Sequence, residues 1–107
     1  MGEPVKIIVE VPESHASAVR KTMAEAGAGI IGNYTGCSFS VKEIGRFTPQ
    51  EGANPAIGKV GKSEKVVEEQ IQMVCARSNL ASIIAAIKQV HPYEEPGIAV
   101  YSLEELP

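Results

Sequence analysis

The segment His91 to Gly97 holds the side chains with the clearest capacity for chemistry. It places His91, Glu94 and Glu95 within five residues, directly after a run of helical periodicity. An imidazole and carboxylates suit a borderline divalent metal such as zinc or copper. The alternative is structural: the two prolines of the segment fix a turn, Tyr93 packs, and His91 caps the end of the preceding helix. The residue types favour this structural alternative over a metal site.

A second stretch of chemical interest runs from Gly45 to Ser63. It holds four glycines, two prolines and three cationic residues, Arg46, Lys59 and Lys62, between two runs of strand-like alternation. Loops of this length are usually functional or disordered. Backbone donors and cations together suit an anion such as a phosphate or a carboxylate. A functional loop and a merely flexible one therefore both remain open.

Two glycine motifs resemble nucleotide-binding signatures but lack their context. Gly27 to Gly32 spells GxGxxG, yet it follows a helical run and precedes a strand, which is the reverse of the dinucleotide fold. Gly61-Lys62-Ser63 lacks the earlier P-loop glycine, because Ala56 stands at that position. His15 has no partner at a meaningful spacing, and no nucleophile stands beside a histidine and an acid. We therefore expect no enzymatic activity from this chain.

Length and composition set the class of protein. With 107 residues, 44% of them hydrophobic, the chain can form one core, so residues 1–107 are expected to be a single domain. The net charge is −3 and the cations are scattered, which argues against nucleic acid as a partner. No basic, apolar leader and no membrane-length apolar run is evident, so a cytoplasmic location without membrane contact is expected. Cys37 and Cys75 are too few for a disulfide framework and are expected to be buried thiols.

Hydrophobic periodicity predicts the order β-α-β-β-α-β. This order indicates an α+β fold of the ferredoxin-like, split βαβ type, with a four-stranded antiparallel sheet and both helices on one face. Ser14 is the expected N-cap of the first helix, and Ser78 or Asn79 that of the second. The expected strands are Val5–Val11, Tyr34–Ile44, Glu64–Ala76 and Ile98–Leu103, and the expected helices are Ser14–Ala26 and the run from residue 79 to Pro92.

The same alternation predicts which side chains share a face of the sheet. In the second strand Cys37, Phe39 and Val41 share one face, as in a sheet covered on one side. In the third strand the buried face is expected to hold Val67, Glu69, Ile71, Met73 and Cys75. The other sheet face is left without helices, and Ile8, Val66 and Val74 on it favour contact with another subunit.

Several segments in this order resemble a known module. They are Gly29 to Tyr34, Cys37-Ser38-Phe39, Gly45 to Pro49, Gly52, Pro55, Ile57-Gly58, Gly61 and His91 to Pro96. Together they resemble the inserted domain of Nif-three-like proteins, which is similar in fold to the PII signalling proteins and the divalent-cation-tolerance protein CutA. The lobes that hold the dinuclear metal site in those larger proteins have no counterpart in this sequence.

The resemblance implies a small oligomeric module that binds a ligand or regulates a partner. By analogy with PII and CutA, a homotrimer with sites between subunits is expected. The alternatives are a divalent metal-binding protein of the CutA kind, with His91, Glu94 and Glu95 as ligands, and a purely structural assembly module. For a small anionic ligand the candidate binding residues are Asn33, Tyr34, Arg46, Gly58, Lys59, Gly61 and Lys62.

Overall fold

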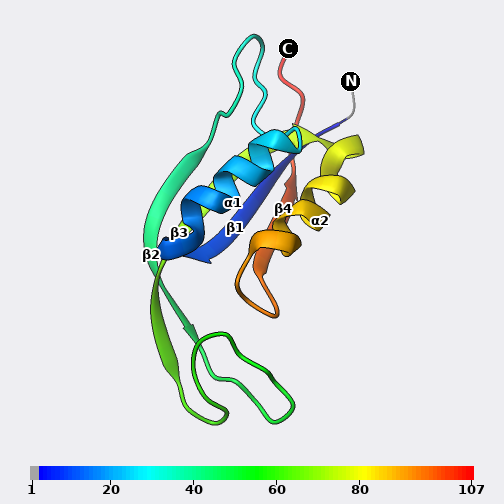
Figure 1. The fold of residues 1–107 in the computed structure, drawn as a ribbon. Coiled ribbons are helices and arrows are strands. Elements are labelled where there is room, and N and C mark those ends of the chain that lie inside the picture. Colours follow the sequence, from blue (N-terminus) through cyan, green and yellow to red (C-terminus); the bar gives the residue numbers. More distant parts are fainter. Residues whose placement is uncertain (1–2) are drawn as a thin grey trace.

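The computed structural model describes residues 3–107, which form an antiparallel sheet with two helices on one of its faces (Figure 1). The sheet has four strands in the order β2-β3-β1-β4. The elements are β1 (Pro4–Pro12), α1 (Glu13–Glu25), β2 (Phe39–Phe47), β3 (Glu64–Ala76), a 3-10 turn (Arg77–Asn79), α2 (Leu80–Val90) and β4 (Gly97–Ser102). The predicted ferredoxin-like fold and its order of elements are confirmed.

The core lies between the helices and the covered sheet face. β1 alternates as its sequence predicts, with Val5, Ile7, Val9 and Val11 fully buried. Their partners come from both helices and from the central strand β3. These partners include Ala16, Val19 and Met23 of α1, Ile83 and Ile87 of α2, and Ile71, Met73 and Cys75 of β3. None of the helices formed by residues 3–107 is long and apolar enough to cross a membrane.

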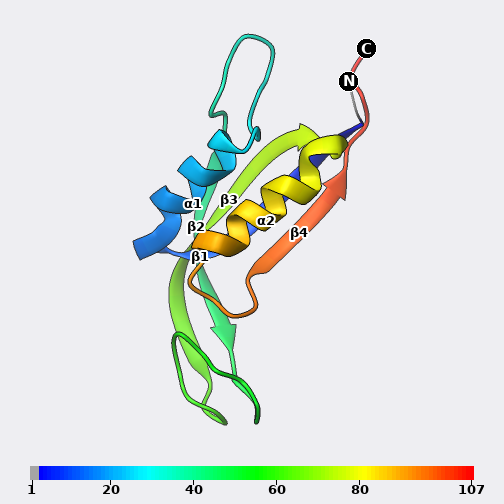
Figure 2. The same cartoon turned by 45° about the vertical axis from the view of Figure 1, so that its right-hand side comes forward.

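The start of β1 and the end of β4 lie side by side because these two strands pair in an antiparallel manner. Val5 stands opposite Ser102, and the backbone amide of Leu103 donates to the carbonyl oxygen of Pro4 at 3.0 Å. The first and last strands therefore enter and leave the fold side by side (Figure 2).

The predicted second strand was placed too early. β2 begins at Phe39, because Gly32 and Gly36 adopt φ angles of +56° and +67° and Ile31 pairs with Tyr34 in a tight turn. These conformations suit glycine and do not continue a strand. Cys37 consequently lies in this loop as a half-buried free thiol, while Cys75 is buried in β3. The strand instead continues to Phe47, so that Gly45 and Arg46 belong to β2 and not to the following loop.

The third strand changes its burial pattern along its length. Val67 is exposed although it shares a face with the buried Ile71, and Glu68 is buried on the opposite face. The reason is that β2 and β3 extend past the ends of both helices (Figure 1), so the covered face of the sheet ends before Val67. The predicted burial of Val67 is therefore wrong.

The helices begin without the predicted side-chain caps. The N-cap residue of α1 is Pro12 and not the predicted Ser14. Asn79 occupies the N-cap position of α2, as predicted, but its side chain makes no capping hydrogen bond. Burial of the apolar stripe of each helix against the sheet holds these helices in place.

The molecule is elongated, with principal extents of 49 Å, 23 Å and 22 Å. The loop 26–38 projects at one end, and the loop 48–63 closes the β2–β3 hairpin at the other (Figure 1).

Candidate functional site

Strand register brings three glutamates together on the sheet face that carries no helix. Glu43 of β2 stands directly opposite Glu68 of β3. Glu10 of β1 stands opposite Gln70, two residues along β3 from Glu68. Residues opposed in an antiparallel pair share a face, as do residues two apart in a strand. The three carboxylates therefore lie on one face near the base of the 48–63 loop.

The turn after α2 is fastened to β1 through His91. The Nε2 atom of His91 lies 2.7 Å from the carbonyl oxygen of Glu10, and the backbone amide of Tyr93 donates to Nδ1 at 3.1 Å. Nδ1 is thus the acceptor and Nε2–H the donor, which is the neutral tautomer. Burial lowers the pKa of His91, against the opposite influence of the hydrogen bond to Glu10 and the nearby charge of Glu68, and so favours the neutral ring. His91 is the C-cap residue of α2, as predicted, and its backbone amide donates to the carbonyl oxygen of Ile87 at 2.9 Å. Its ring does not bond the last carbonyls of the helix and instead links the turn to the sheet.

Tyr93 extends from this turn to the buried glutamate. Its hydroxyl donates to Oε2 of Glu68 at 2.7 Å, and its ring meets the ring of Phe47 edge-on at a centroid distance of 5.7 Å. Burial, and then the hydrogen bond to Glu68, raise the pKa of Tyr93, so the phenol remains a donor. This bond and ring contact tie the turn to β2 and β3, and Glu68 is left only 4% exposed.

Gly45 makes room for the carboxylate of Glu68. A Cβ atom at position 45 would lie 2.3 Å from Oε1 and 2.8 Å from Oε2 of Glu68, well inside contact distance. Any larger residue at this position in β2 would displace Glu68 from the place where it accepts the bond from Tyr93.

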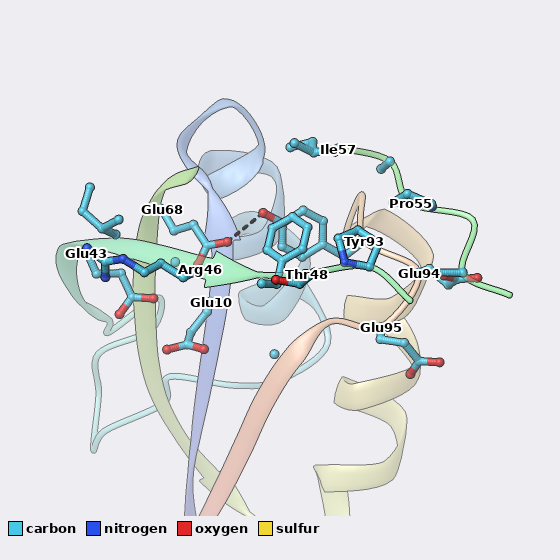
Figure 3. A pocket seen from close by; sticks show the side chains of 17 residues that line it. Glu10, Glu43, Arg46, Thr48, Pro55, Ile57, Glu68, Tyr93, Glu94 and Glu95 are labelled. Atoms are coloured by element: carbon cyan, nitrogen blue, oxygen red, sulfur yellow. Dashed lines mark hydrogen bonds between the residues drawn. The ribbon is translucent and has the colours of Figure 1, made fainter. Parts of the chain in front are cut away.

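A cavity of about 570 Å³ opens beside these groups (Figure 3). Its wall comes from β1, from the end of β2, from β3, from residues 53–57 of the loop and from the turn 93–97. In Figure 3 the carboxylates of Glu10, Glu43 and Glu68 gather on one side, away from Glu94 and Glu95. The backbone amide of Asn54 donates to Oε1 of Glu94 at 3.1 Å, which joins the loop to the turn at the cavity rim. The volume lies within the range of small-molecule sites.

Burial and the neighbouring carboxylates raise the pKa of Glu43. The pKa of Glu43 rises from 4.5 to about 6, chiefly through burial, then through the charge of Glu10 and a hydrogen bond with it, and then through the charge of Glu68. The amide of Gln70, which donates to Oε1 of Glu43 at 3.2 Å, acts in the opposite direction. Near pH 6 the cavity wall therefore gains or loses a proton.

This raised pKa makes stability depend on pH. Because the folded pKa of Glu43 exceeds its unfolded value, its favourable contribution is complete below pH 4.5 and is lost as the pH rises through 6. The shift corresponds to at most about 2 kcal/mol, and screening at this half-exposed position reduces that to about 1 kcal/mol. We expect Glu43→Gln to raise the unfolding midpoint at pH 7.5 by several degrees more than at pH 4, relative to the wild type. Thermal unfolding at both pH values measures this, with Glu25→Gln on α1 as control for net charge, and an equal effect at both pH values would contradict it.

The predicted anion-binding residues fall into separate groups. Arg46 lines the cavity, while Gly58, Lys59, Gly61 and Lys62 lie in the loop beyond it. Asn33 and Tyr34 lie in the loop 26–38 at the opposite end of the molecule, where Tyr34 is 74% exposed (Figure 1). A single chain thus does not bring the two groups to one site. The cavity wall also carries five glutamates and only one arginine, which disfavours an anion there.

The predicted metal ligands have other contacts. Both ring nitrogens of His91 are engaged with backbone atoms, and Glu94 accepts the amide of Asn54. Between residues 3 and 107 there is no group of three or more His, Cys, Asp or Glu side chains that could hold a metal ion. A metal at His91, Glu94 and Glu95 stays a prediction.

Sequence reasoning did not find the residues at the centre of the cavity. Glu10, Glu43 and Glu68 each occupy the polar phase of a strand and carry no signal of their own. Gly45 was the one available signal, since a glycine inside a strand often marks the close approach of another group.

Comparison with known sequences finds similar proteins that are much longer than this chain. No family model matches the chain. Proteins named "GTP cyclohydrolase 1 type 2 homolog" match it: that of Mycobacterium tuberculosis is 43% identical over 98 residues, and that of Bacillus subtilis 41% over 102 residues. These matches cover 92% and 95% of this chain and 26% and 27% of the relatives. The chain therefore spans about a quarter of the length of the curated relatives it matches.

Solved structures that share the fold of this chain include a relative of similar sequence. A Bacillus cereus protein described as related to NIF3 superposes with a TM-score of 0.85 at 41% identity, over 97% of this chain and 26% of that one. CutA of Archaeoglobus fulgidus, a divalent cation tolerance protein, superposes with a TM-score of 0.71 at 18% identity, over 97% of this chain and 87% of that one. The latter likeness supports the fold alone.

Proposed function

Because the chain is homologous to one segment of the NIF3-related proteins, about a quarter of their length, we propose that it is a single ligand-binding or regulatory domain whose site is the cavity beneath the 48–63 loop. The observation that carries this proposal is the cavity itself. Its wall is assembled from five parts of the chain, and two hydrogen bonds, Tyr93 to Glu68 and Asn54 to Glu94, join the turn to β3 and to the loop.

We propose binding without catalysis by this segment. The cavity wall offers carboxylates, a phenol, one guanidinium and the hydroxyl of Thr48, and no serine, cysteine or histidine side chain lines it within the part of the chain described. The Thr48 hydroxyl forms no hydrogen bond with a carboxylate among residues 3–107. An acyl- or group-transfer site needs a nucleophile beside a base. The activity named for the longer relatives is therefore not assigned to this quarter of their length.

The regulatory part of the proposal rests on the loop. Gly52, Gly58 and Gly61 all adopt positive φ, which gives the segment 48–63 conformations open to few other residues. The bond from Asn54 to Glu94 joins it to the cavity rim. A ligand beneath the loop would alter this contact and move the exposed Lys59 and Lys62. Such a movement would change the surface that the loop offers for binding a partner protein.

A cavity-blocking variant tests the binding site. Ala53 lines the cavity, so Ala53→Trp should fill it, whereas Ala81→Trp on the exposed side of α2 is the matched control. We expect at least one member of a mixture of neutral, anionic and cationic fragments to shift the amide resonances of Gly45, Phe47 and Gly97. The shifts should weaken at least tenfold in Ala53→Trp and persist in Ala81→Trp. If no fragment shifts these amides, or if blocking has no effect, the proposal fails.

We further propose that a second copy of this chain covers the open sheet face. Phe39 is 67% exposed, Val41 55% and Tyr101 56%. Their pairing with Gln72, Gln70 and Lys6 places all three on the face without helices. Exposed apolar groups gathered on one face of a sheet indicate a contact surface. The predicted homotrimer is the assembly we expect.

A further inference from the structure

The groups around the cavity narrow the class of ligand that it accepts. Resting on the proposal that the cavity is a binding site, we infer that its ligand is a small organic cation, whose ammonium or guanidinium group lies between Glu43 and Glu68 and against the ring of Tyr93.

Glu68 is a largely buried residue of the cavity wall, and one of its carboxylate oxygens has no protein partner among the described residues. The side chain is more than nine-tenths buried, and its Oε2 accepts the hydrogen bond from Tyr93. No hydrogen bond or ion pair formed within residues 3–107 reaches its Oε1. The described residues contain no fully enclosed side-chain oxygen or nitrogen without a partner, so Oε1 is not fully enclosed, and Glu68 is one of the residues that line the cavity. A carboxylate oxygen without a protein partner in this position can accept a hydrogen bond from a ligand.

The carboxylates also lack a balancing charge. The ion pairs formed by residues 3–107 are Arg20 with Glu69 and Lys42 with Glu13, and neither includes a glutamate of the cavity. Arg46 is the one cation in the described wall, and it forms no ion pair there. Glu43 and Glu68 stand directly opposite each other, an arrangement that is unfavourable for like charges. A cation between them would relieve that repulsion and gain two charge-assisted hydrogen bonds.

The aromatic residues add a surface suited to the same ligand. The rings of Phe47 and Tyr93 meet edge-on, and both residues line the cavity. The face of an aromatic ring attracts an organic cation, and the attraction grows when water is excluded. Pro55 and Ile57 extend this apolar side and suit a hydrocarbon portion attached to the charged group.

Other occupants fit less well. An anion would face five carboxylates with one guanidinium to hold it. A bare divalent metal would need three or more side chains converging at bonding distance, and the described residues contain no such group. A proton shared by Glu10 and Glu43 is the competing occupant of the carboxylates.

Three probes of equal length separate these cases. They are 1,5-diaminopentane, 1,5-pentanediol and glutarate, each titrated into the isotope-labelled chain at pH 7.5 and constant ionic strength. We expect the diamine to shift the amide resonances of Gly45, Phe47 and Gly97. The diol and glutarate should bind with at least tenfold lower affinity. Glu43→Gln and Glu68→Gln should each weaken diamine binding at least tenfold, whereas Glu25→Gln, which removes the same charge from α1, should change it less than twofold.

The outcomes are distinguishable from failure of the cavity proposal. If the diol or glutarate shifts the same amides and the diamine does not, the cavity binds ligands but the cationic class is wrong. Equal weakening by Glu25→Gln and Glu43→Gln would reduce the effect to overall charge and overturn the inference. If none of the three probes shifts these amides, a shared proton suffices at the carboxylates and the inference fails, while the fragment test with Ala53→Trp decides the cavity itself.

Discussion

Gly45→Ala is expected to destabilise the protein by about 1–3 kcal/mol and to weaken ligand binding in the cavity at least tenfold. The new Cβ would stand 2.3 Å from Oε1 of Glu68, so the carboxylate must leave its place. That movement breaks the 2.7 Å hydrogen bond from Tyr93, and a bond to a charged acceptor is worth about 1.5–3 kcal/mol. Chemical denaturation measures the loss of stability, and the diamine titration measures the loss of binding.

Two further variants show whether Glu68 is the cause. In Gly32→Ala the added Cβ meets nothing within 4 Å, so only the strain of its positive φ remains, about 1 kcal/mol. In a Glu68→Ala background the space is empty, and Gly45→Ala should then cost less than about 1 kcal/mol. A full cost of Gly45→Ala in that background would show that the contact with Glu68 is not responsible.

The second large effect concerns assembly. Phe39→Glu should weaken self-association at least a hundredfold, because it places an unpaired charge among the apolar side chains of the proposed contact. The stability of the isolated chain should change by less than about 0.5 kcal/mol, because Phe39 is exposed there. Sedimentation velocity over a range of micromolar concentrations measures the association. Gln89→Glu, on the exposed side of α2, adds the same charge away from the sheet.

The result would count against a second copy on this face in two cases. One is a wild-type chain that stays monomeric throughout the range. The other is a Phe39→Glu chain that associates as strongly as Gln89→Glu.

Periodicity was sufficient for the fold because the core is built from alternating strands and two apolar helix stripes. Val5 to Val11 alternate without interruption, and all four apolar positions are buried as predicted. The pattern failed in the second strand, where Cys37, Phe39 and Val41 read as one alternating run. The loop that contains Gly36 interrupts the strand before Phe39, and the apolar residues that follow face away from the helices.

The candidate site was predictable only in part. The sequence points to both the Gly45–Ser63 stretch and the His91 segment, and each contributes to the cavity. The first contributes Arg46 of β2 and Ala53 of the loop, and the second contributes Tyr93. Which glutamates meet depends on the register of β2 with β3, and a long connecting loop leaves that register undetermined by sequence. The burial of Glu68 depends on Tyr93 reaching it from a turn 25 residues away, which local sequence patterns do not report.

The pairing of Pro4 with Leu103 has a consequence for how this fold can be combined with others. Strands that pair lie about 5 Å apart, so the path into the fold and the path out of it are separated by little more than one strand spacing. A surface loop of a host protein could carry the whole domain without the two ends of that loop being forced apart. The host would then bear only a small loss of chain entropy, and each unit could unfold while the other stayed intact. The adjacent ends thus allow this fold to be inserted into a loop of a longer chain without distorting the structure of the host.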